Sequence, residues 1–194
     1  MDSSSSPTPA STLTFDSAQI LQTIVRDAQD QQVEYNVQTT TANGRGVDKK
    51  RWMTFVEVEG VATAAIDWRE KTFEISGTRC ALSKMRRKRS AFASSRYWTW
   101  FDCEEYKVKY EAEAVNTWTV YSYTGSVLAT FSASTSRLFR GKTNPILTLS
   151  SSVSDEEERQ FILLVLLYSE TRRMEGLKKE RGRRLVDLLN KGGP

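Results

Sequence analysis

The chain contains no histidine, and this excludes several kinds of catalytic and metal site. Ser-His-Asp and Cys-His nucleophile systems, the H-E-x-x-H metalloprotease motif and imidazole-dependent zinc sites cannot be built without it. The two cysteines, Cys80 and Cys103, have no third thiol to join them, so neither a thiolate zinc site nor a disulfide framework is expected. We therefore expect two buried structural cysteines, no metal, no cofactor, no catalytic residues and no enzymatic activity.

Targeting signals are also missing from the sequence. Residues 1–7 show no basic stretch followed by an apolar one, and no Asn-x-Ser/Thr acceptor for glycosylation occurs. We expect a cytoplasmic protein, with a peripheral membrane or a nuclear location as alternatives. Because 39% of the 194 residues are hydrophobic, the chain can bury the core of one domain.

Alternation of apolar and polar residues predicts a protein made mainly of short β-strands. In the segment 33–38, Val33, Tyr35 and Val37 fall on one face and polar residues on the other, as a half-buried antiparallel strand requires. Turn-forming pairs such as Glu59-Gly60 and Thr124-Gly125 separate several of these segments. The other expected strands are 52–58, 61–67, 72–76, 96–101, 106–111, 117–123, 126–132 and 146–149.

One segment breaks this pattern and predicts a helix over 155–174. A capping box with Ser154 as the N-cap and Glu157 at its third helical position opens the helix, and Gly176 is a stop signal. Between them lies the run of eight apolar residues 161–168, which covers more than two turns and leaves no face for water. Such a run rises only about 12 Å, too little for a transmembrane segment.

A helix that is apolar on all sides must be surrounded by other parts of the protein, and a sheet closed into a barrel can surround it. The expected fold is mainly β, a single-domain closed antiparallel β-barrel around a central hydrophobic C-terminal helix. Residues 1–11 are expected to be a disordered Ser/Thr/Pro tail. Residues 12–176 are assigned to the barrel domain, and residues 177–194 to a basic C-terminal extension that could form a short helix.

On these features the sequence resembles the tubby C-terminal-like superfamily, whose members close a β-barrel around a hydrophobic helix. The likeness is greatest to a family of uncharacterised fungal proteins with a domain of unknown function. The superfamily includes phosphoinositide-binding tubby proteins and phospholipid scramblases, so the resemblance implies this fold and suggests lipid as a ligand. The matching segments are Asp27 to Thr40, Ile66-Asp67-Trp68, Phe73 to Gly77, Tyr106 to Lys109, Val127 to Phe131 and the helix ending Tyr168-Ser169-Glu170.

The net charge of +4 hides two concentrated basic segments in an otherwise acidic chain. The first is the run 84–89, with five cations in six positions, and the second begins after the apolar helix, with eight basic and three acidic residues from 172 onward. A dense basic segment can bind an anionic membrane surface, act as a nuclear import signal or contact a nucleic acid. The competing interpretation is a solvated loop between strands. The candidate anionic-lipid ligands are Lys84, Arg86, Arg87, Lys88, Arg89, Arg172 and Arg173.

The aromatic run Tyr97-Trp98-Thr99-Trp100-Phe101 offers a further interpretation, because aromatic rings beside cations can stack nucleic-acid bases. Trp98 and Trp100 share one strand face, which favours the barrel core instead. A nucleic-acid partner is therefore not expected.

The sequence predicts a non-enzymatic binding module that recognises anionic lipid, a phosphoinositide, through a basic loop. The alternative is a protein-interaction scaffold in which the basic run serves nuclear import or solubility. Ser90 follows four cations in the pattern that basophilic kinases favour, and phosphate there would oppose the positive charge of the run. An unmodified surface serine is the competing interpretation of Ser90.

Overall fold

A computed structural model of the chain describes residues 11–41, 51–89, 95–101, 104–112, 116–134, 136–137 and 141–191. Side chains are described in these ranges except at 51, 136, 137, 141, 142 and 185–191. Ser11 begins the first strand, and the rest of the expected N-terminal tail lies outside the described residues.

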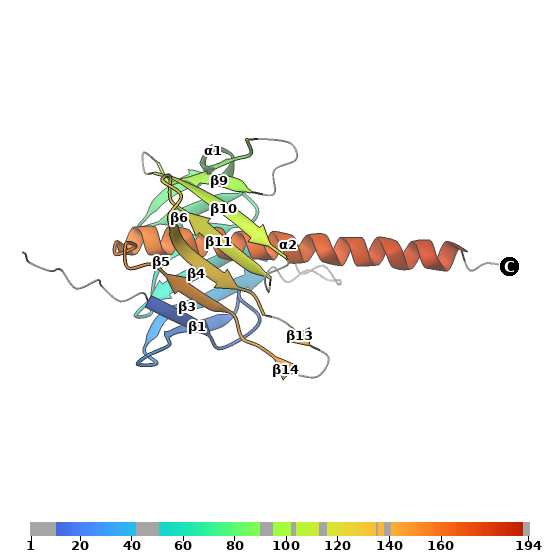
Figure 1. Cartoon of the computed structure of the whole chain (residues 1–194), viewed down its shortest axis with the longest axis horizontal. Coiled ribbons are helices and arrows are strands. Elements are labelled where there is room, and N and C mark those ends of the chain that lie inside the picture. Colours follow the sequence, from blue (N-terminus) through green and yellow to red (C-terminus); the bar gives the residue numbers. More distant parts are fainter. Residues whose placement is uncertain are drawn as a thin grey trace, which may run out of the picture.

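Strands dominate the structure, with one short helix among them and one long helix at the end (Figure 1). The helices are α1 (Leu82–Met85) and α2 (Glu156–Lys191). The strands in the first half of the chain are β1 (Ser11–Phe15), β2 (Thr23–Asp27), β3 (Val33–Thr41), β4 (Arg51–Val58), β5 (Val61–Asp67), β6 (Thr72–Ile75), β7 (Thr78–Ala81) and β8 (Arg86–Arg87). Those in the second half are β9 (Arg96–Thr99), β10 (Glu105–Glu111), β11 (Thr117–Tyr121), β12 (Val127–Ser132), β13 (Ser136–Arg137), β14 (Gly141–Lys142) and β15 (Ile146–Leu149).

One antiparallel sheet of 13 strands forms the body of the protein, in the order β7-β6-β5-β4-β3-β2-β1-β15-β12-β11-β10-β9-β8. Strands β13 and β14 form a separate hairpin. The two edge strands of the large sheet, β7 and β8, are consecutive in the chain and are linked by the single turn of α1. Among the described residues no hydrogen-bonded ladder joins these two edges, so the sheet is not shown closed into a barrel.

The nine strands expected from alternation are present, with ends that differ by up to three residues. Glu59-Gly60 makes the predicted turn between β4 and β5, and both residues have the positive φ (50° and 80°) of a type I′ hairpin. Strands β1, β2, β7, β8, β13 and β14 were not predicted. Edge strands β7 and β8 are short and largely exposed, so they lack the alternation that identifies a half-buried strand.

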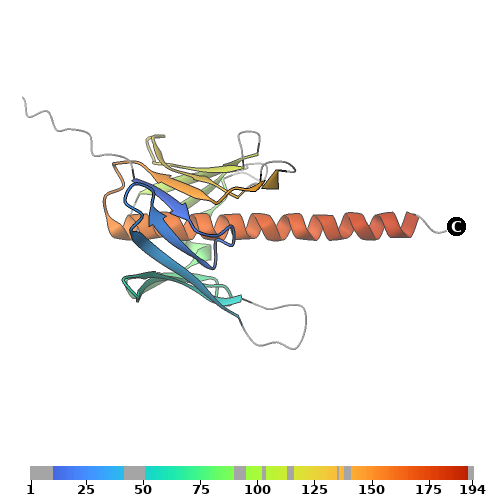
Figure 2. The same cartoon turned by 90° about the horizontal axis from the view of Figure 1, so that it is seen from below.

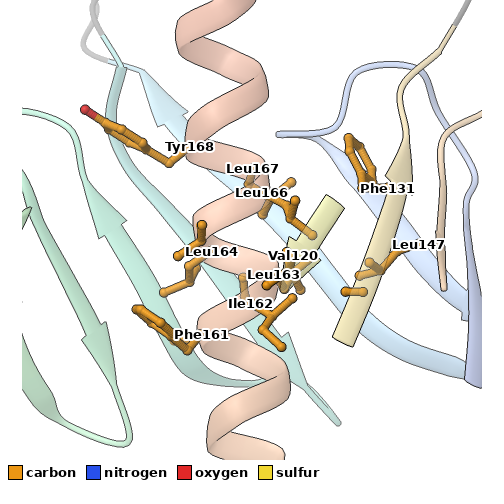
Figure 3. Close-up of a cluster of buried hydrophobic side chains, with 14 of the residues drawn as sticks. Val120, Phe131, Leu147, Phe161, Ile162, Leu163, Leu164, Leu166, Leu167 and Tyr168 are labelled. Carbon is orange, nitrogen blue, oxygen red and sulfur yellow. The ribbon is translucent and has the colours of Figure 1, made fainter. Parts of the chain in front are cut away.

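The first half of α2 packs along the sheet, with strands on either side of it in two perpendicular views (Figures 1 and 2). All eight residues of the apolar run 161–168 are buried, none more than 6% exposed. Phe131 and Leu147 of the sheet face one side of the helix, while Phe161 and Tyr168 point to the other (Figure 3). The prediction of a core helix without a solvent face is therefore confirmed.

The N-terminus of α2 differs from the predicted capping box by one residue. The helix begins at Glu156, and the backbone N–H of Glu158 donates to Asp155 Oδ2 at 2.9 Å. Asp155 therefore occupies the N-cap, because its carboxylate satisfies the N–H of the third helical residue. The assignment of this role to Ser154 was wrong, since both residues are good caps and the sequence offers no way to choose between adjacent ones.

The identity of the N-cap, Asp155 or Ser154, can be tested by mutation. We expect Asp155→Ala to lower the free energy of unfolding by about 1 kcal/mol, because an N–H at the start of α2 loses its acceptor. Ser154→Ala should leave stability within about 0.5 kcal/mol of the parent, as for an ordinary surface substitution. Urea denaturation of both variants measures the difference, and a larger loss for Ser154→Ala would return the cap to that residue.

The C-terminal end of α2 also differs from the prediction. The helix does not stop at Gly176 but continues to Lys191, so that 155–174 covers little more than its first half. From 176 to 184 every residue is exposed, and this part of the helix projects beyond the sheet (Figures 1 and 2). A glycine in a helix interior costs only about 1 kcal/mol relative to alanine, which good helix formers around it can offset.

Hydrogen bonds from aromatic side chains hold the start of α2 in the sheet. Three successive glutamates of the first turn each accept one: Glu156 from Tyr35, Glu157 from Trp100 and Glu158 from Tyr106. Burial, together with the Glu156 carboxylate, raises the pKa of Tyr35 above its ordinary value, which favours the protonated hydroxyl that donates to Glu156. These bonds fix where the helix enters the sheet.

Two further expectations concern buried side chains. Trp98 and Trp100 are both buried, as their shared strand face predicts. Cys80 is a free thiol on β7 and is partly rather than fully buried, while Cys103 lies outside the described residues.

Candidate anion-binding site

The basic run 84–89 is not one solvated loop. Lys84 and Met85 end α1, Arg86 and Arg87 form β8, and only Lys88 and Arg89 follow outside regular structure. Met85 is buried in the core. The description of this run as a basic loop was therefore wrong, because a buried methionine and pairing with β9 order the chain here.

Strand β8 sends its two arginines to opposite faces of the sheet. Arg86 pairs in register with Trp98 and Arg87 with Tyr97. Since directly paired residues share a face and neighbours alternate, Arg86 lies on the inner face with buried Trp98, and Arg87 lies on the outer face with Tyr97. Two adjacent arginines of the basic run are thus divided between two surfaces.

On the inner face an aromatic cluster surrounds the ring of Tyr168 on α2. Trp68 stacks on it with ring centres 5.6 Å apart, and Phe73 and Trp98 meet it edge to face at 5.9 and 5.8 Å. Phe73 and Trp98 stack on each other at 5.8 Å. These rings come from three different strand regions, so Tyr168 is fixed in position by packing.

Both basic segments reach this tyrosine. The guanidinium carbon of Arg86 lies 5.7 Å from the centre of the Tyr168 ring, and that of Arg172 lies at the same distance. Arg86 Nη1 also donates to the Tyr168 hydroxyl at 3.4 Å. We name Arg86, Arg172 and Tyr168 the Tyr168 site. Two arginines far apart in sequence are brought together here by one ring.

The positive charge of the Tyr168 site is incompletely neutralised. Arg172 pairs with Glu175 at 2.9 Å, whereas no carboxylate lies within ion-pair distance of Arg86 among the residues that the structure describes. Both arginines are exposed, and Lys84 is exposed on α1 two residues before Arg86. An incoming anion can therefore reach these cations, and at Arg86 it would displace none of the carboxylates that the structure describes.

The other candidate lipid ligands lie elsewhere. Arg173 packs over Tyr110 and makes a two-point ion pair with buried Glu170, so its charge is already balanced. Arg89 pairs with Glu105 and lies over the ring of Tyr97. Arg87 is on the outer face, Lys88 is exposed after β8, and Ser90 lies outside the described residues.

Sequence reasoning missed the aromatic half of the site. Tyr168 ends an apolar run and reads as one more core residue, yet it is the one member of that run with a hydroxyl. A polar tip at the end of a buried run, four residues before the exposed Arg172, is the signal that could have located it. The part of the chain that the structure describes has no group of three acidic or thiol side chains placed to hold a metal ion.

The fold and the site define a mainly β protein, in which a long C-terminal helix packs against an antiparallel sheet of 13 strands. The helix contributes Tyr168 and Arg172 to the Tyr168 site, and strand β8 contributes Arg86. Comparison of the chain with protein-family models, with curated protein sequences and with solved structures finds no match. Within the described residues, no helix combines the length and the apolar character needed to cross a membrane.

Proposed function

We propose that the chain is a non-enzymatic binding module that recognises an anionic lipid headgroup, a phosphoinositide, at the Tyr168 site. The observation that carries this proposal is the meeting of Arg86 and Arg172, from the two basic segments, on a single tyrosine ring. Concentrated charge from two segments of an otherwise acidic chain is the arrangement expected for a specific anionic partner.

The chemistry of these side chains suits phosphate groups. A guanidinium presents paired donors that match two phosphate oxygens, and arginine makes such charge-assisted bonds at a lower dehydration cost than lysine. Packing on Tyr168 and Trp98 orients the Arg86 guanidinium before a ligand arrives. Lys84 adds a third exposed cation near the same end of the sheet.

The proposal includes a closed barrel of the tubby C-terminal-like kind. Support comes from the position of α1, which links the two edge strands directly, and from the burial of α2 on all sides between 161 and 168. Closure would bring both edges of the sheet beside Arg86, because β8 is itself one of those edges.

Vesicle sedimentation tests the lipid proposal. We expect the protein to sediment with phosphatidylcholine vesicles that contain phosphatidylinositol bisphosphate, and not with phosphatidylcholine alone, at about 0.15 M salt. The double variant Arg86→Gln/Arg172→Gln should bind about thirty-fold more weakly, since each basic side chain near an anionic surface contributes up to about 1 kcal/mol.

Arg26→Gln is the matched control, because Arg26 is a surface cation on β2 that pairs with Asp16. It should bind like the parent, and thermal melts of all variants should confirm that they fold. Parent-like binding by the double variant, or an equal loss in Arg26→Gln, would contradict the proposal.

A protein-interaction scaffold is the second candidate, and a separate groove favours it. A cavity of about 540 Å³ lies where α2 leaves the sheet, between the β1–β2 connection, the end of β12 and the helix. Its apolar lining includes Ile20, Leu21, Ala133 and Met174. A stoichiometric protein partner that is retained by Arg86→Gln/Arg172→Gln and lost by Met174→Arg would favour this function over lipid binding.

A further inference from the structure

The outer face of the sheet carries a second concentration of cations and aromatic rings, in a row across four neighbouring strands. Arg87 of β8 is paired with Tyr97 of β9, Tyr97 with Lys107 of β10, and Lys107 with Tyr121 of β11. Directly paired residues share one face, so these four side chains stand side by side. We name them the outer row; its strands β9, β10 and β11 are neighbours in Figure 1.

A groove of about 430 Å³ follows this row. The outer row supplies its floor through Tyr97, Lys107 and Tyr121, and the β11–β12 turn adds one wall with Tyr123 and its hydroxyl-bearing neighbours. Tyr123 is 75% exposed, which is unusual for a ring of its size. The groove therefore offers aromatic surface and hydroxyl groups around a central lysine.

Charge in the groove is positive after its own ion pairs are counted. Arg89 pairs with Glu105 and Lys109 with Glu111. Lys107 lies 5.6 Å from the centre of the Tyr121 ring, and in the described parts of the chain no carboxylate is within ion-pair distance of it. Lys107 is thus an unbalanced cation held between two tyrosines.

The outer row is separate from the Tyr168 site. Alternation along β8 puts Arg86 and Arg87 on opposite faces, so no residue of the outer row contributes to the cluster around Tyr168. Ligand binding at the outer row is independent of the lipid function proposed for the Tyr168 site.

We propose that the outer row binds single-stranded nucleic acid. Rings that alternate with cations allow bases to stack on the aromatic side chains while phosphates contact the cations, and stacking of this kind tolerates any sequence. Adjacent strands lie about 4.8 Å apart, so Tyr97 and Tyr121 are about 10 Å apart with Lys107 between them. The Arg89 guanidinium already lies 4.1 Å from the centre of the Tyr97 ring, so a base at this position stacks on the Tyr97–Arg89 pair. With a second base on Tyr121, the intervening backbone phosphate lies over Lys107.

A single strand fits this surface better than a duplex does. The groove lies across the strands of one sheet face, and its rings can stack only on bases that are not already paired. Two of the three cations that line the groove, Arg89 and Lys109, are engaged by glutamates, so the groove relies on stacking as well as on charge.

Fluorescence anisotropy with a labelled 12-nucleotide oligo(dT) tests this inference on the full chain. We expect binding that weakens with salt, and a loss of at least five-fold in Tyr97→Leu and in Tyr121→Leu, because each removes a stacking platform. Tyr97→Phe should restore binding, since it keeps the ring. In Lys107→Gln the slope of log K against log salt should decrease by about 0.7, the value for one phosphate contact to a single strand.

Matched controls separate this site from general charge and from the Tyr168 site. Lys179→Gln, on the projecting half of α2, and Arg86→Gln/Arg172→Gln should bind the oligonucleotide like the parent. A 12-base-pair duplex should bind more weakly than the single strand. The inference is overturned if Lys179→Gln weakens oligonucleotide binding as much as Lys107→Gln does, or if both leucine variants fold and bind the oligonucleotide like the parent. It is also overturned if the protein binds no oligonucleotide and substitutions in the outer row weaken only its binding to anionic vesicles.

Discussion

Leu164→Ala, on the long helix, is expected to lower the free energy of unfolding by about 2–5 kcal/mol. Leu164 is completely buried in the part of α2 that strands flank on both sides. Removing its side chain forfeits burial of apolar surface and leaves a cavity that a packed sheet closes only in part. A whole domain is stable by about 5–15 kcal/mol, so this loss is a large share of the total.

The same helix provides the control for this prediction. Leu177 lies on the projecting half of α2 and is 38% exposed, so Leu177→Ala should change stability by less than about 1 kcal/mol. Urea denaturation of the two variants compares one substitution in two environments on a single helix. Equal losses would show that the sheet does not bury this part of α2.

Arg173→Met is expected to cost about 3–5 kcal/mol, although arginine is usually a surface residue. The Glu170 carboxylate is only 6% exposed, and it is held by two donors of Arg173 at 2.7 Å and by Trp118 Nε1 at 2.9 Å. Without the guanidinium, Glu170 keeps one neutral donor, and a buried charge without its partner is strongly destabilising. Arg173→Met also removes the packing over Tyr110.

A double-mutant cycle measures this coupling. Glu170→Gln/Arg173→Met should be more stable than Arg173→Met alone, because the unpaired charge is gone. Arg172→Met is the neighbouring control: its ion pair with Glu175 is exposed, and its loss should cost less than about 1 kcal/mol. Additive effects of the Glu170 and Arg173 substitutions would contradict the assignment of a coupled buried pair.

The same pair engages Arg173, one of the predicted lipid ligands, with a buried carboxylate. From the sequence, Arg172 and Arg173 are two equal cations after an apolar run. The helix turns by about 100° between them, so one meets Tyr168 and the other meets Glu170 and Tyr110. Which arginine remains available depends on strands that are distant in sequence.

Local patterns in the sequence determined the elements of this protein. Alternation of apolar and polar residues identified nine strands, because each strand has one solvent-exposed face and one buried face. Eight consecutive apolar residues identified a helix with no solvent-exposed face. Edge strands β7 and β8 and the continuation of α2 beyond Gly176 escaped prediction, because exposed residues and a single glycine carry little local signal. Adjacent candidates for the N-cap could not be separated for the same reason.

Only the tertiary structure decided which of these residues act together. Strand pairing split Arg86 from Arg87, and helix packing carried Arg172 to the ring that Arg86 already contacts. The outer row consists of residues from four strands, aligned by a register that depends on hydrogen bonds between those strands. Local sequence patterns involve residues that are near one another in the chain, whereas the Tyr168 site and the outer row combine residues from different strands and from the helix. Both surfaces therefore became apparent only in the fold.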